Sequence, residues 1–329
     1  MSKNPRILVI RGGAIGDFIL TLPALGALRG RWRNARIEIL GYSHIVELAV
    51  GRHYAQASRS IEYGALSGFF APNAKLDEAL RDYFASFDVV VSYLYDPDKF
   101  FEDNLRRAGV KHLVVGSAKP SSLHAASHYA KPLESLAIYA EDLVPRVHLT
   151  REDVEFGKRF TASAAPLRVA VHCGSGSPRK NWPARFFAEV CQRILAKRRA
   201  SVICVSGEAD AAATAEFLLR LGMVNVWEAQ NLKLTSLAGA LSQCQLFLGN
   251  DSGISHLAAA VGVPSVVLWF PGSSPVWQPR GENVRIIPFN RASPQQVGEV
   301  AESLLDAHPQ SQVGGGSLPS DIPHFDSED

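Results

Sequence analysis

The sequence predicts an α/β protein made of two similar domains, each a parallel sheet with helices on both faces. The chain has 329 residues, about twice the roughly 150 residues of one domain. Short apolar runs alternate with helical patterns along most of its length, as in parallel-sheet proteins. The two halves also begin alike, with RILVIRGGAIGD in the first and RVAVHCGSGSPR in the second. Each is a short apolar run followed by a glycine-rich turn.

In the first half, short runs rich in Val, Ile and Leu are typical of buried parallel strands. They predict strands at Arg6–Ile10, Arg36–Leu40, Asp88–Tyr93 and His112–Val115. Apolar residues at helical spacing lie between these runs. They predict a helix from the first glycine-rich turn to about Arg29, and others near Lys75–Ser86, Pro97–Ala108 and Leu133–Leu143.

The second half repeats the alternation of strands and helices. Strands are expected at Arg168–His172, Ser201–Val205, Val224–Trp227, Gln245–Leu248, Pro264–Trp269 and Val284–Pro288. Helices are expected near Ala184–Arg198, Ala209–Leu221, Leu234–Ser242, Ser252–Val261 and Pro294–Ala307. The domains would therefore cover residues 1–150 and 167–307, joined by a polar linker at 151–166. Residues 308–329 have few core-forming side chains and are predicted to be disordered.

Composition excludes several classes of protein. Lys and Arg number 34 and Asp and Glu 32, a net charge of +2, so a nucleic-acid partner is not expected. The four cysteines form no C-x-x-C pair, which favours buried free thiols over disulfides or a zinc site. The first apolar run is too short for a signal peptide, and no run approaches 18 apolar residues. A cytoplasmic protein is expected.

The first motif is the turn RGGAIGD, which contains Gly12, Gly13, Gly16 and Asp17. A glycine-rich turn before a helix lets a ligand approach the backbone closely. It is not the G-x-G-x-x-G fingerprint of dinucleotide-binding proteins. Asp17, in the first helical turn, either complements the helix dipole or accepts a proton from a substrate hydroxyl. The second role is possible because ligands bind at this edge of α/β sheets.

The second motif is HCGSGSPRKNWP, from His172 to Pro183. Ser175 and Gly176 offer hydroxyl and backbone N–H donors, and Lys180 offers a mobile positive charge. Donors and a lysine at a strand-to-helix turn suit phosphate binding, although the G-K-[ST] of a P-loop is missing. A flexible polar loop with an exposed lysine is the alternative.

The third motif is GNDSGISH, from Gly249 to His256. Asp251 or Ser252 would cap the following helix, whose free N–H groups could hold a pyrophosphate. Asp251 would repel phosphate, so a hydroxyl or a base suits it better. His256 lies one turn further, where a lone histidine is more often part of the core than a ligand. Glu208, after another strand of this half, could accept a ribose hydroxyl.

Two weaker signals remain. Arg29, Arg31, Arg33 and Arg36 form a basic cluster that would meet an anionic acceptor or membrane surface or, as we favour, lie in a solvated turn. The turn-rich segment Pro271–Gly281 contains Trp277 and either borders a ligand or is a plain surface loop.

Together, RGGAIGDFILTLPALGALR, HCGSGSPRKNWPARFFAEV and GNDSGISHLAAAVGVPSVVLW resemble glycosyltransferase family 9, the heptosyltransferases of bacterial lipopolysaccharide core synthesis. The resemblance spans roughly residues 6 to 305. It implies the GT-B fold, in which two Rossmann-like, doubly wound domains face a cleft. The first domain would bind the acceptor and the second the nucleotide-sugar.

The resemblance also implies roles for individual residues. Asp17 would be the catalytic base, and Lys180 would lie near the donor phosphates. Asp251, Ser252, Gly253 and His256 would form the donor-binding turn, with donor contacts at Ser175, Gly176 and Glu208. Gly12, Gly13 and Gly16 would form a loop on the acceptor side. Negative charge on the departing nucleoside diphosphate would be met by the positive charge of Lys180, helix N–H groups and His256, without a metal.

The implied activity is inverting transfer of a sugar, a heptose from ADP-heptose, to a lipopolysaccharide-core or related glycan acceptor. A glycolipid acceptor would bring this cytoplasmic protein to the inner face of the membrane. Another nucleotide-sugar donor, or a non-catalytic nucleotide-sugar-binding protein of the same fold, is the alternative. A nicotinamide-dependent dehydrogenase lacks support because its fingerprint is missing.

Overall fold

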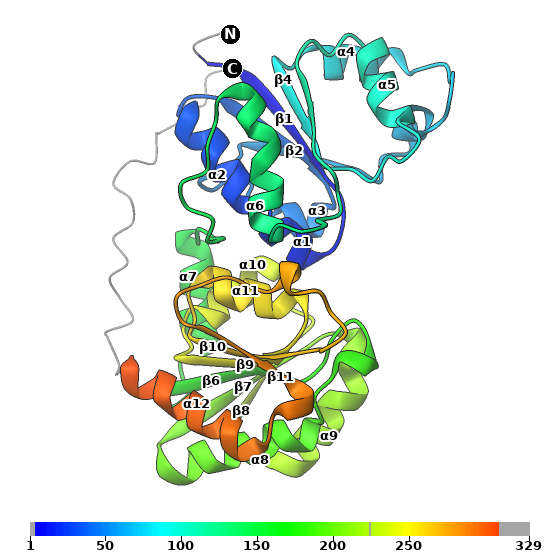
Figure 1. Ribbon diagram of the computed structural model, residues 1–329. Coiled ribbons are helices and arrows are strands. Elements are labelled where there is room, and N and C mark those ends of the chain that lie inside the picture. The colour runs from blue at the N-terminus through cyan, green and yellow to red at the C-terminus, as the bar shows by residue number, and fades with distance from the viewer. Residues whose placement is uncertain (1–3, 224, 309–329) are drawn as a thin grey trace.

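The computed structural model describes residues 4–223 and 225–308, which form two α/β domains, one above the other in Figure 1. The two sheets are parallel throughout the described residues, as the sequence predicts. The segment 309–329, predicted to be disordered, lies outside the described residues, as does Val224 at the start of one predicted strand.

The N-terminal sheet has the strand order β3-β2-β1-β4-β5. Its strands are β1 (Arg6–Arg11), β2 (Arg36–Gly41), β3 (Ala57–Ser60), β4 (Val89–Ser92) and β5 (Leu113–Val115). Strand β1, buried from Ile7 to Arg11, lies in the middle, with Val9 opposite Ile39 on β2 and Val91 on β4. The sequence does not predict β3, because its residues ASRS are polar and it lies at the sheet edge.

Helices cover both faces of this sheet. On one face lie α1 (Ile15–Ile19), α2 (Leu22–Arg31), α3 (Ser43–Val46) and α6 (Ala125–Ala130). On the other lie the 3₁₀ helix Gly64–Phe70, α4 (Glu78–Ala85) and α5 (Phe100–Arg107). The single predicted helix ending near Arg29 is two helices. The second begins at Leu22 and has Pro23 in its first turn, where proline is tolerated. The predicted helix Leu133–Leu143 is a 3₁₀ helix at Lys131–Leu136.

The C-terminal sheet has the order β11-β10-β9-β6-β7-β8. Its strands are β6 (Leu167–His172), β7 (Ala200–Ser206), β8 (Val226–Gln230), β9 (Leu246–Asn250), β10 (Ser265–Trp269) and β11 (Val284–Pro288). Counted from β6, this is the 3-2-1-4-5-6 order of dinucleotide-binding domains, and the N-terminal sheet repeats 3-2-1-4-5. In such sheets the chain changes direction beside the first strand, and ligands bind outside the strand ends there.

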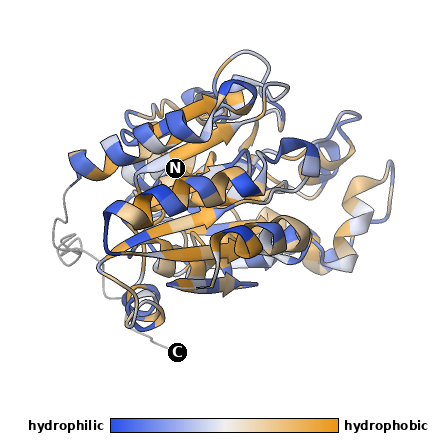
Figure 2. Cartoon of the chain, turned by 90° about the horizontal axis from the view of Figure 1, so that it is seen from below, coloured by the Kyte–Doolittle hydropathy of each residue, from blue (hydrophilic) through white to orange (hydrophobic). Residues whose placement is uncertain are grey.

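The C-terminal sheet is also covered on both faces (Figure 1). Helices α7 (Arg151–Phe160), α10 (Leu234–Leu241) and α11 (Gly253–Val261) lie on the face toward the N-terminal domain. Helices α8 (Ala184–Lys197), α9 (Ala211–Leu221) and α12 (Pro294–Ala307) cover the opposite face. Figure 2 shows hydrophobic strands between helices whose outer surfaces are hydrophilic. This is the pattern expected of a sheet buried on both faces.

The segment 151–166, predicted as a linker, contains α7. This helix packs closely on α10, because a Cβ atom added to Gly157 would lie 2.0 Å from the Gly239 carbonyl oxygen. Asp153 of α7 also accepts a hydrogen bond from Arg52 of the N-terminal domain at 2.6 Å. The segment is therefore a packed helix that contacts both domains.

The basic cluster after the first helix is only partly a solvated turn. Arg31, Arg33 and Arg36 are exposed, but Arg29 is buried. Its guanidinium donates to the carbonyl oxygens of Arg33, Ala35 and Tyr54 and to Oε1 of Gln56, at 2.8–3.1 Å. Arg29 therefore fastens the turn after α2 to the edge of the sheet.

The two domains share an apolar cluster that includes Phe18 and Ile19 of α1 and Leu257 of α11. Helix α1 follows β1 and α11 follows β9, and these helices pack on each other. The carboxyl ends of the two central strands therefore face each other across the domain boundary. All four cysteines are buried and free, as predicted. Within the described residues, no helix is long and apolar enough to cross a membrane.

Candidate active site

Asp17 lies in the first turn of α1, with its carboxylate folded back on the glycine-rich turn. Its Oδ2 accepts a hydrogen bond from the Ala14 N–H at 3.0 Å. Gly13 has a φ of +97°, and a Cβ atom there would lie 2.6 Å from this oxygen, so glycine is required for both reasons. No hydrogen bond of Oδ1 is found within the described residues. Asp17 therefore caps the helix with one oxygen and leaves the other available to a substrate, so its two predicted roles are compatible.

A buried positive charge lies behind Asp17. The guanidinium of Arg11 donates from Nε to Thr21 Oγ1 at 3.0 Å and from Nη2 to the Tyr129 hydroxyl at 2.8 Å. The Thr21 hydroxyl in turn donates to the Asp17 carbonyl oxygen at 2.8 Å. Burial raises the pKa of Tyr129 to about 12, against the opposing effect of Arg11. Arg11 is not among the residues predicted from the sequence, although a charged residue at the end of an apolar strand is a usable signal.

The turn of Asp17 touches the third motif directly. A Cβ atom on Gly16 would lie 2.9 Å from Cδ2 of His256, and one on Gly253 would lie 2.8 Å from Cβ of Ile15. Gly16, predicted on the acceptor-side loop, therefore contacts helix α11 of the C-terminal domain. Both glycines allow α1 and α11 to approach this closely. Gly12 is less constrained, since its added Cβ would have its nearest contact at 3.4 Å, with Leu94.

His256, which the resemblance places in the donor-binding turn, is buried. Burial, with the nearby charges of His124 and Lys180, lowers its pKa to about 3. Its Nδ1 atom is buried without a hydrogen-bond partner within the described residues. The cost of burying an imidazolium therefore favours a neutral ring, and a role of His256 at the leaving group stays a prediction.

In the second motif, Ser175 is buried and orders its own loop. Its Oγ lies 2.7 Å from the Ser177 carbonyl oxygen and 2.6 Å from Asn181 Oδ1. Gly176 faces open space, since an added Cβ would meet no atom within 4 Å. Gly176 is thus the more accessible of the two predicted donor contacts. Glu208, at the start of a short 3₁₀ helix after β7, is exposed.

Lys180 and Asp251 bring the second and third motifs together. Their Nζ and Oδ2 atoms are 3.1 Å apart, with the lysine side chain 37% exposed and the aspartate 9%. The Ser273 hydroxyl also donates to this carboxylate. The negative charge of Asp251 is therefore balanced by Lys180, which remains reachable from solvent. A phosphate that bound to Lys180 would replace Asp251 as the anionic partner of the lysine.

Ser252 occupies the N-cap position of α11, as predicted, but forms no side-chain capping bond. Its Oγ instead lies 3.2 Å from Nδ1 of His172, at the end of β6. Ser252 therefore occupies the N-cap position without making a capping hydrogen bond, and the first turn of α11 keeps its N–H groups free of a side-chain acceptor.

Asn250, which joins the second and third motifs, is also not among the residues predicted from the sequence. It is fully buried. Its Oδ1 accepts from the Trp182 N–H at 2.9 Å, and its Nδ2 donates to the Cys173 carbonyl oxygen at 2.8 Å. A polar residue closing an apolar strand was the available signal, since buried amides are normally fully hydrogen-bonded.

The segment Pro271–Gly281 is not a plain surface loop. The Gln278 carbonyl oxygen lies 2.8 Å from Nε2 of His124, at the start of α6. The rings of Trp277 and Tyr129 also lie 6.5 Å apart. The loop therefore links the C-terminal domain to the N-terminal domain beside Arg11.

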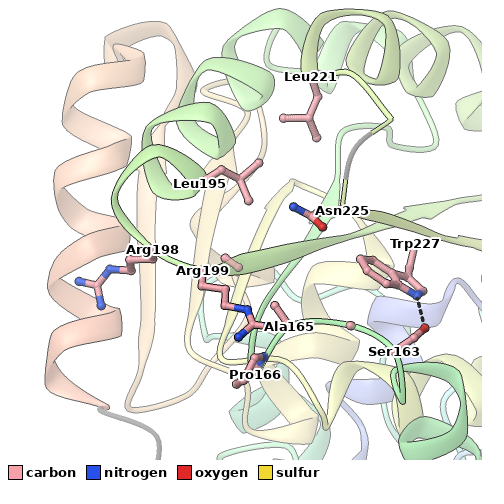
Figure 3. Close-up of a pocket in the computed structure, with 11 residues that line it drawn as sticks. Ser163, Ala165, Pro166, Leu195, Arg198, Arg199, Leu221, Asn225 and Trp227 are labelled. Atoms are coloured by element: carbon pink, nitrogen blue, oxygen red, sulfur yellow. Dashed lines mark hydrogen bonds between the residues drawn. The ribbon is translucent and has the colours of Figure 1, made fainter.

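Two cavities lie away from these residues. One of about 430 Å³ is at the amino ends of β6, β7 and β8, and Figure 3 shows Arg199 and Trp227 on its wall. Another, of about 210 Å³, is at the carboxyl ends of β4 and β5, next to Tyr95 and Val115. Only the second is on the ligand-binding edge of its sheet. Within residues 4–223 and 225–308, no cluster of three His, Cys, Asp or Glu side chains could hold a metal ion.

Comparison with known proteins identifies the family. A model of glycosyltransferase family 9 (heptosyltransferase) matches residues 117–304. Lipopolysaccharide heptosyltransferase 3 of Escherichia coli is 23% identical over 297 residues, which cover 82% of this chain and 84% of that protein. Lipopolysaccharide heptosyltransferase 2 of Escherichia coli strain K12 is 29% identical over 142 residues, so this match spans 40% of each chain.

Solved structures establish the fold. A glycosyltransferase of family 9 from Veillonella parvula DSM 2008 superimposes with a TM-score of 0.76 at 20% identity, covering 93% of this chain and 99% of that one. ADP-heptose lipopolysaccharide heptosyltransferase II of Escherichia coli gives 0.74 at 19% identity, with 92% and 99% covered. The predicted GT-B architecture is confirmed. The family model also matches more than half of the chain. The chain therefore belongs to glycosyltransferase family 9, the heptosyltransferases, as its three motifs predict.

Proposed function

We propose that this glycosyltransferase moves a heptose from ADP-heptose, with inversion, onto a sugar of the lipopolysaccharide inner core or a related glycan. The family and the names of the Escherichia coli relatives support the sugar and the pathway. A structural neighbour, Escherichia coli heptosyltransferase WaaC, is described with ADP, which supports the nucleotide. The observation that carries the proposal is the contact of Gly16 with His256, which brings Asp17 against the proposed donor turn.

The reaction is a single displacement at the anomeric carbon. Asp17 takes the proton of the acceptor hydroxyl as that oxygen bonds to the anomeric carbon. The bond from this carbon to the diphosphate breaks, and the electron pair leaves with ADP. General-base help of this kind is worth about 10²–10⁴ in rate. Oδ2 of Asp17 is held by Ala14, so Oδ1 is the atom proposed to accept the proton.

Charge that develops on the departing diphosphate would be stabilised from the C-terminal domain. Lys180 would turn from Asp251 to the phosphates, and the uncapped first turn of α11 would offer its N–H groups. Gly176 and Gly253 would give the phosphates close access to the backbone, with Ser175 ordering the loop beneath them. This set supplies positive charge without a metal.

The remaining assignments are also proposals. Glu208 and Asp251 would contact hydroxyl groups or the base of the donor. The turn of Gly12 and Gly13 would face the acceptor in a first domain of residues 1–150, and residues 167–307 would hold the donor. A glycolipid acceptor would place the enzyme in the cytoplasm, in peripheral contact with the inner face of the membrane.

A panel of ADP-, UDP-, GDP- and CDP-sugars, read by thermal shift and by product formation, tests the donor. A ligand at 100 times its dissociation constant stabilises a protein by about 2.7 kcal/mol. We expect this for ADP-heptose alone, together with heptosyl transfer. Stabilisation by another nucleotide-sugar instead would refute the donor assignment. Binding of ADP-heptose without transfer to any glycan acceptor would refute the proposed transfer reaction.

Lys180→Ala tests the phosphate site, with its exposed neighbour Arg179→Ala as the matched control. Both variants lose one positive charge from the same short 3₁₀ helix. We expect Lys180→Ala to weaken ADP binding at least tenfold and Arg179→Ala to change it less than twofold. Equal effects would mean that the loop attracts ADP only through its overall charge.

A further inference from the structure

A buried histidine joins three turns at the carboxyl edge of the C-terminal sheet. His172 ends β6, is 3% exposed, and lies between β7 and β9 in the sheet. Its Nε2 donates to Asp210 Oδ2 at 2.9 Å, and its Nδ1 lies 3.2 Å from Ser252 Oγ. These partners follow the neighbouring strands β7 and β9, so one imidazole links both turns that flank the second motif.

Asp210, the partner of His172 Nε2, lies in a closely packed turn. Its Oδ2 also accepts from the Gly207 N–H at 3.0 Å. A Cβ atom on Gly174 would lie 1.9 Å from Asp210 Oδ1, so only glycine fits there. Burial opposes ionisation of Asp210, but the hydrogen bond and charge of His172, with the Gly207 N–H, outweigh it and lower the pKa. Asp210 therefore fixes the imidazole ring in one orientation.

The Ser252 side has a consequence for α11. An N-cap serine normally turns its oxygen toward the N–H groups of the first turn, which satisfies them. Here the hydroxyl is engaged by His172 and makes no capping bond. Helix α11 has nine residues, Gly253–Val261. The Ser255 N–H donates to the Ser252 carbonyl oxygen at 3.2 Å, so the first-turn N–H groups left without an acceptor within the described residues are those of Gly253 and Ile254.

We propose that His172 is a positioning residue that holds the Ser252 hydroxyl away from the N-terminus of α11, leaving its N–H groups to the donor diphosphate. The inference rests on the proposed function, since it assumes that a nucleoside diphosphate binds at this turn. Without the imidazole, the serine hydroxyl folds back onto the helix and competes with the phosphate oxygens. His172 thereby favours binding of the nucleotide without touching it.

The test is ADP affinity by calorimetry in His172→Ala, Ser252→Ala and the double variant. Loss of about one hydrogen bond's net contribution predicts a five- to tenfold weaker ADP affinity for His172→Ala. The KM for the donor should rise similarly. In the double variant no hydroxyl is left to compete, so ADP should bind no more weakly than to Ser252→Ala alone. Additive losses in the double variant would overturn the proposal.

Two further variants separate the contacts of the imidazole. The amide of His172→Asn reaches the position of Nδ1 and can still hold Ser252, whereas that of His172→Gln reaches Nε2 and holds only Asp210. We expect His172→Asn to recover ADP affinity and His172→Gln not to. Equal affinities in the two variants would overturn the assigned role of the Ser252 contact.

Ser201→Ala controls for general destabilisation. Ser201 is fully buried at the opposite edge of the same sheet, where its Oγ accepts from the Ala165 N–H at 2.8 Å. This variant should melt earlier and bind ADP like the wild type. If His172→Ala also binds ADP within twofold of the wild type, the inference alone fails. If the wild type binds no ADP, the proposed donor fails and the inference fails with it.

Discussion

The close contact between α1 and α11 predicts opposite changes in stability for alanine substitutions at Gly16 and at Gly12. In Gly16→Ala, the new Cβ would lie 2.9 Å from Cδ2 and 3.2 Å from Nε2 of His256, whose ring is buried. Alanine in a helix otherwise gains about 0.5–1 kcal/mol over glycine. Overpacking costs about 1–3 kcal/mol. We expect a net loss of about 1 kcal/mol, the difference between the mid-points of these two ranges.

Gly12→Ala is the matched control, because Gly12 lies in the same turn but its added Cβ has a nearest contact of 3.4 Å. Restricting the unfolded chain should stabilise this variant by about 0.4–1 kcal/mol. Thermal unfolding separates the two outcomes. Gly16→Ala should lower the melting temperature by about 2–4 °C, whereas Gly12→Ala should leave it unchanged or raise it.

A double-mutant cycle identifies the cause. In a His256→Ala background the ring is absent, so Gly16→Ala should lose its penalty and show a coupling of about 0.5–3 kcal/mol. A Gly16→Ala variant as stable as Gly12→Ala would refute the reasoning. A loss of stability on Gly16→Ala that persists in the His256→Ala background would also refute it, because the added methyl group would then not be limited by the imidazole.

Three other outcomes are expected. Asn250→Leu leaves the backbone N–H of Trp182 and the carbonyl oxygen of Cys173 unpaired, which costs about 1–3 kcal/mol for each group. Chemical denaturation should show this loss of unfolding free energy, and a loss under about 1 kcal/mol would contradict the prediction. Burial raises the pKa of Cys173 and Cys204 to about 12, so a thiol reagent at pH 8 should label the native chain slowly and all four cysteines once it is unfolded. Because the pKa of His256 is about 3 when folded and about 6.5 when unfolded, the unfolded state binds the extra proton first, and stability falls as pH drops from 6.5 toward 5. The His256→Ala variant has no imidazole to protonate, so the difference between its free energy of unfolding and that of the wild type should shrink by up to about 1.4 kcal/mol per pH unit as the pH falls. A difference that stays constant would mean that the imidazole is solvated in the folded protein.

The sequence allows the fold to be predicted where local pattern decides the structure. The bounds of β11 and α12 agree with prediction residue for residue, because an apolar run and a Ser-Pro helix start are local signals. The pattern fails for β3, a polar edge strand, and for α7, whose charged sequence resembles a linker. These elements are held by the neighbours on which they pack.

The site was predictable only in part, for the same reason. The three motifs locate Asp17, Lys180 and Ser252, since glycine-rich turns after strands mark the ligand-binding edge. Partner choice depends on strand order, which brings together residues far apart in the chain. The ion pair of Lys180 with Asp251 joins positions 71 residues apart, from 251 − 180. The neutral state of His256 likewise follows from burial at the domain boundary, which no local pattern reports.

Heptosyl transfer by Asp17→Asn, measured beside ADP affinity, tests the central claim most directly. The asparagine keeps an oxygen for the Ala14 N–H that Oδ2 now accepts, so the fold and ADP binding should change less than twofold. Transfer from ADP-heptose should fall by about 10²–10⁴ because the general base is lost. A variant that transfers sugar at a near-native rate would show that Asp17 only caps its helix and that another group takes the proton.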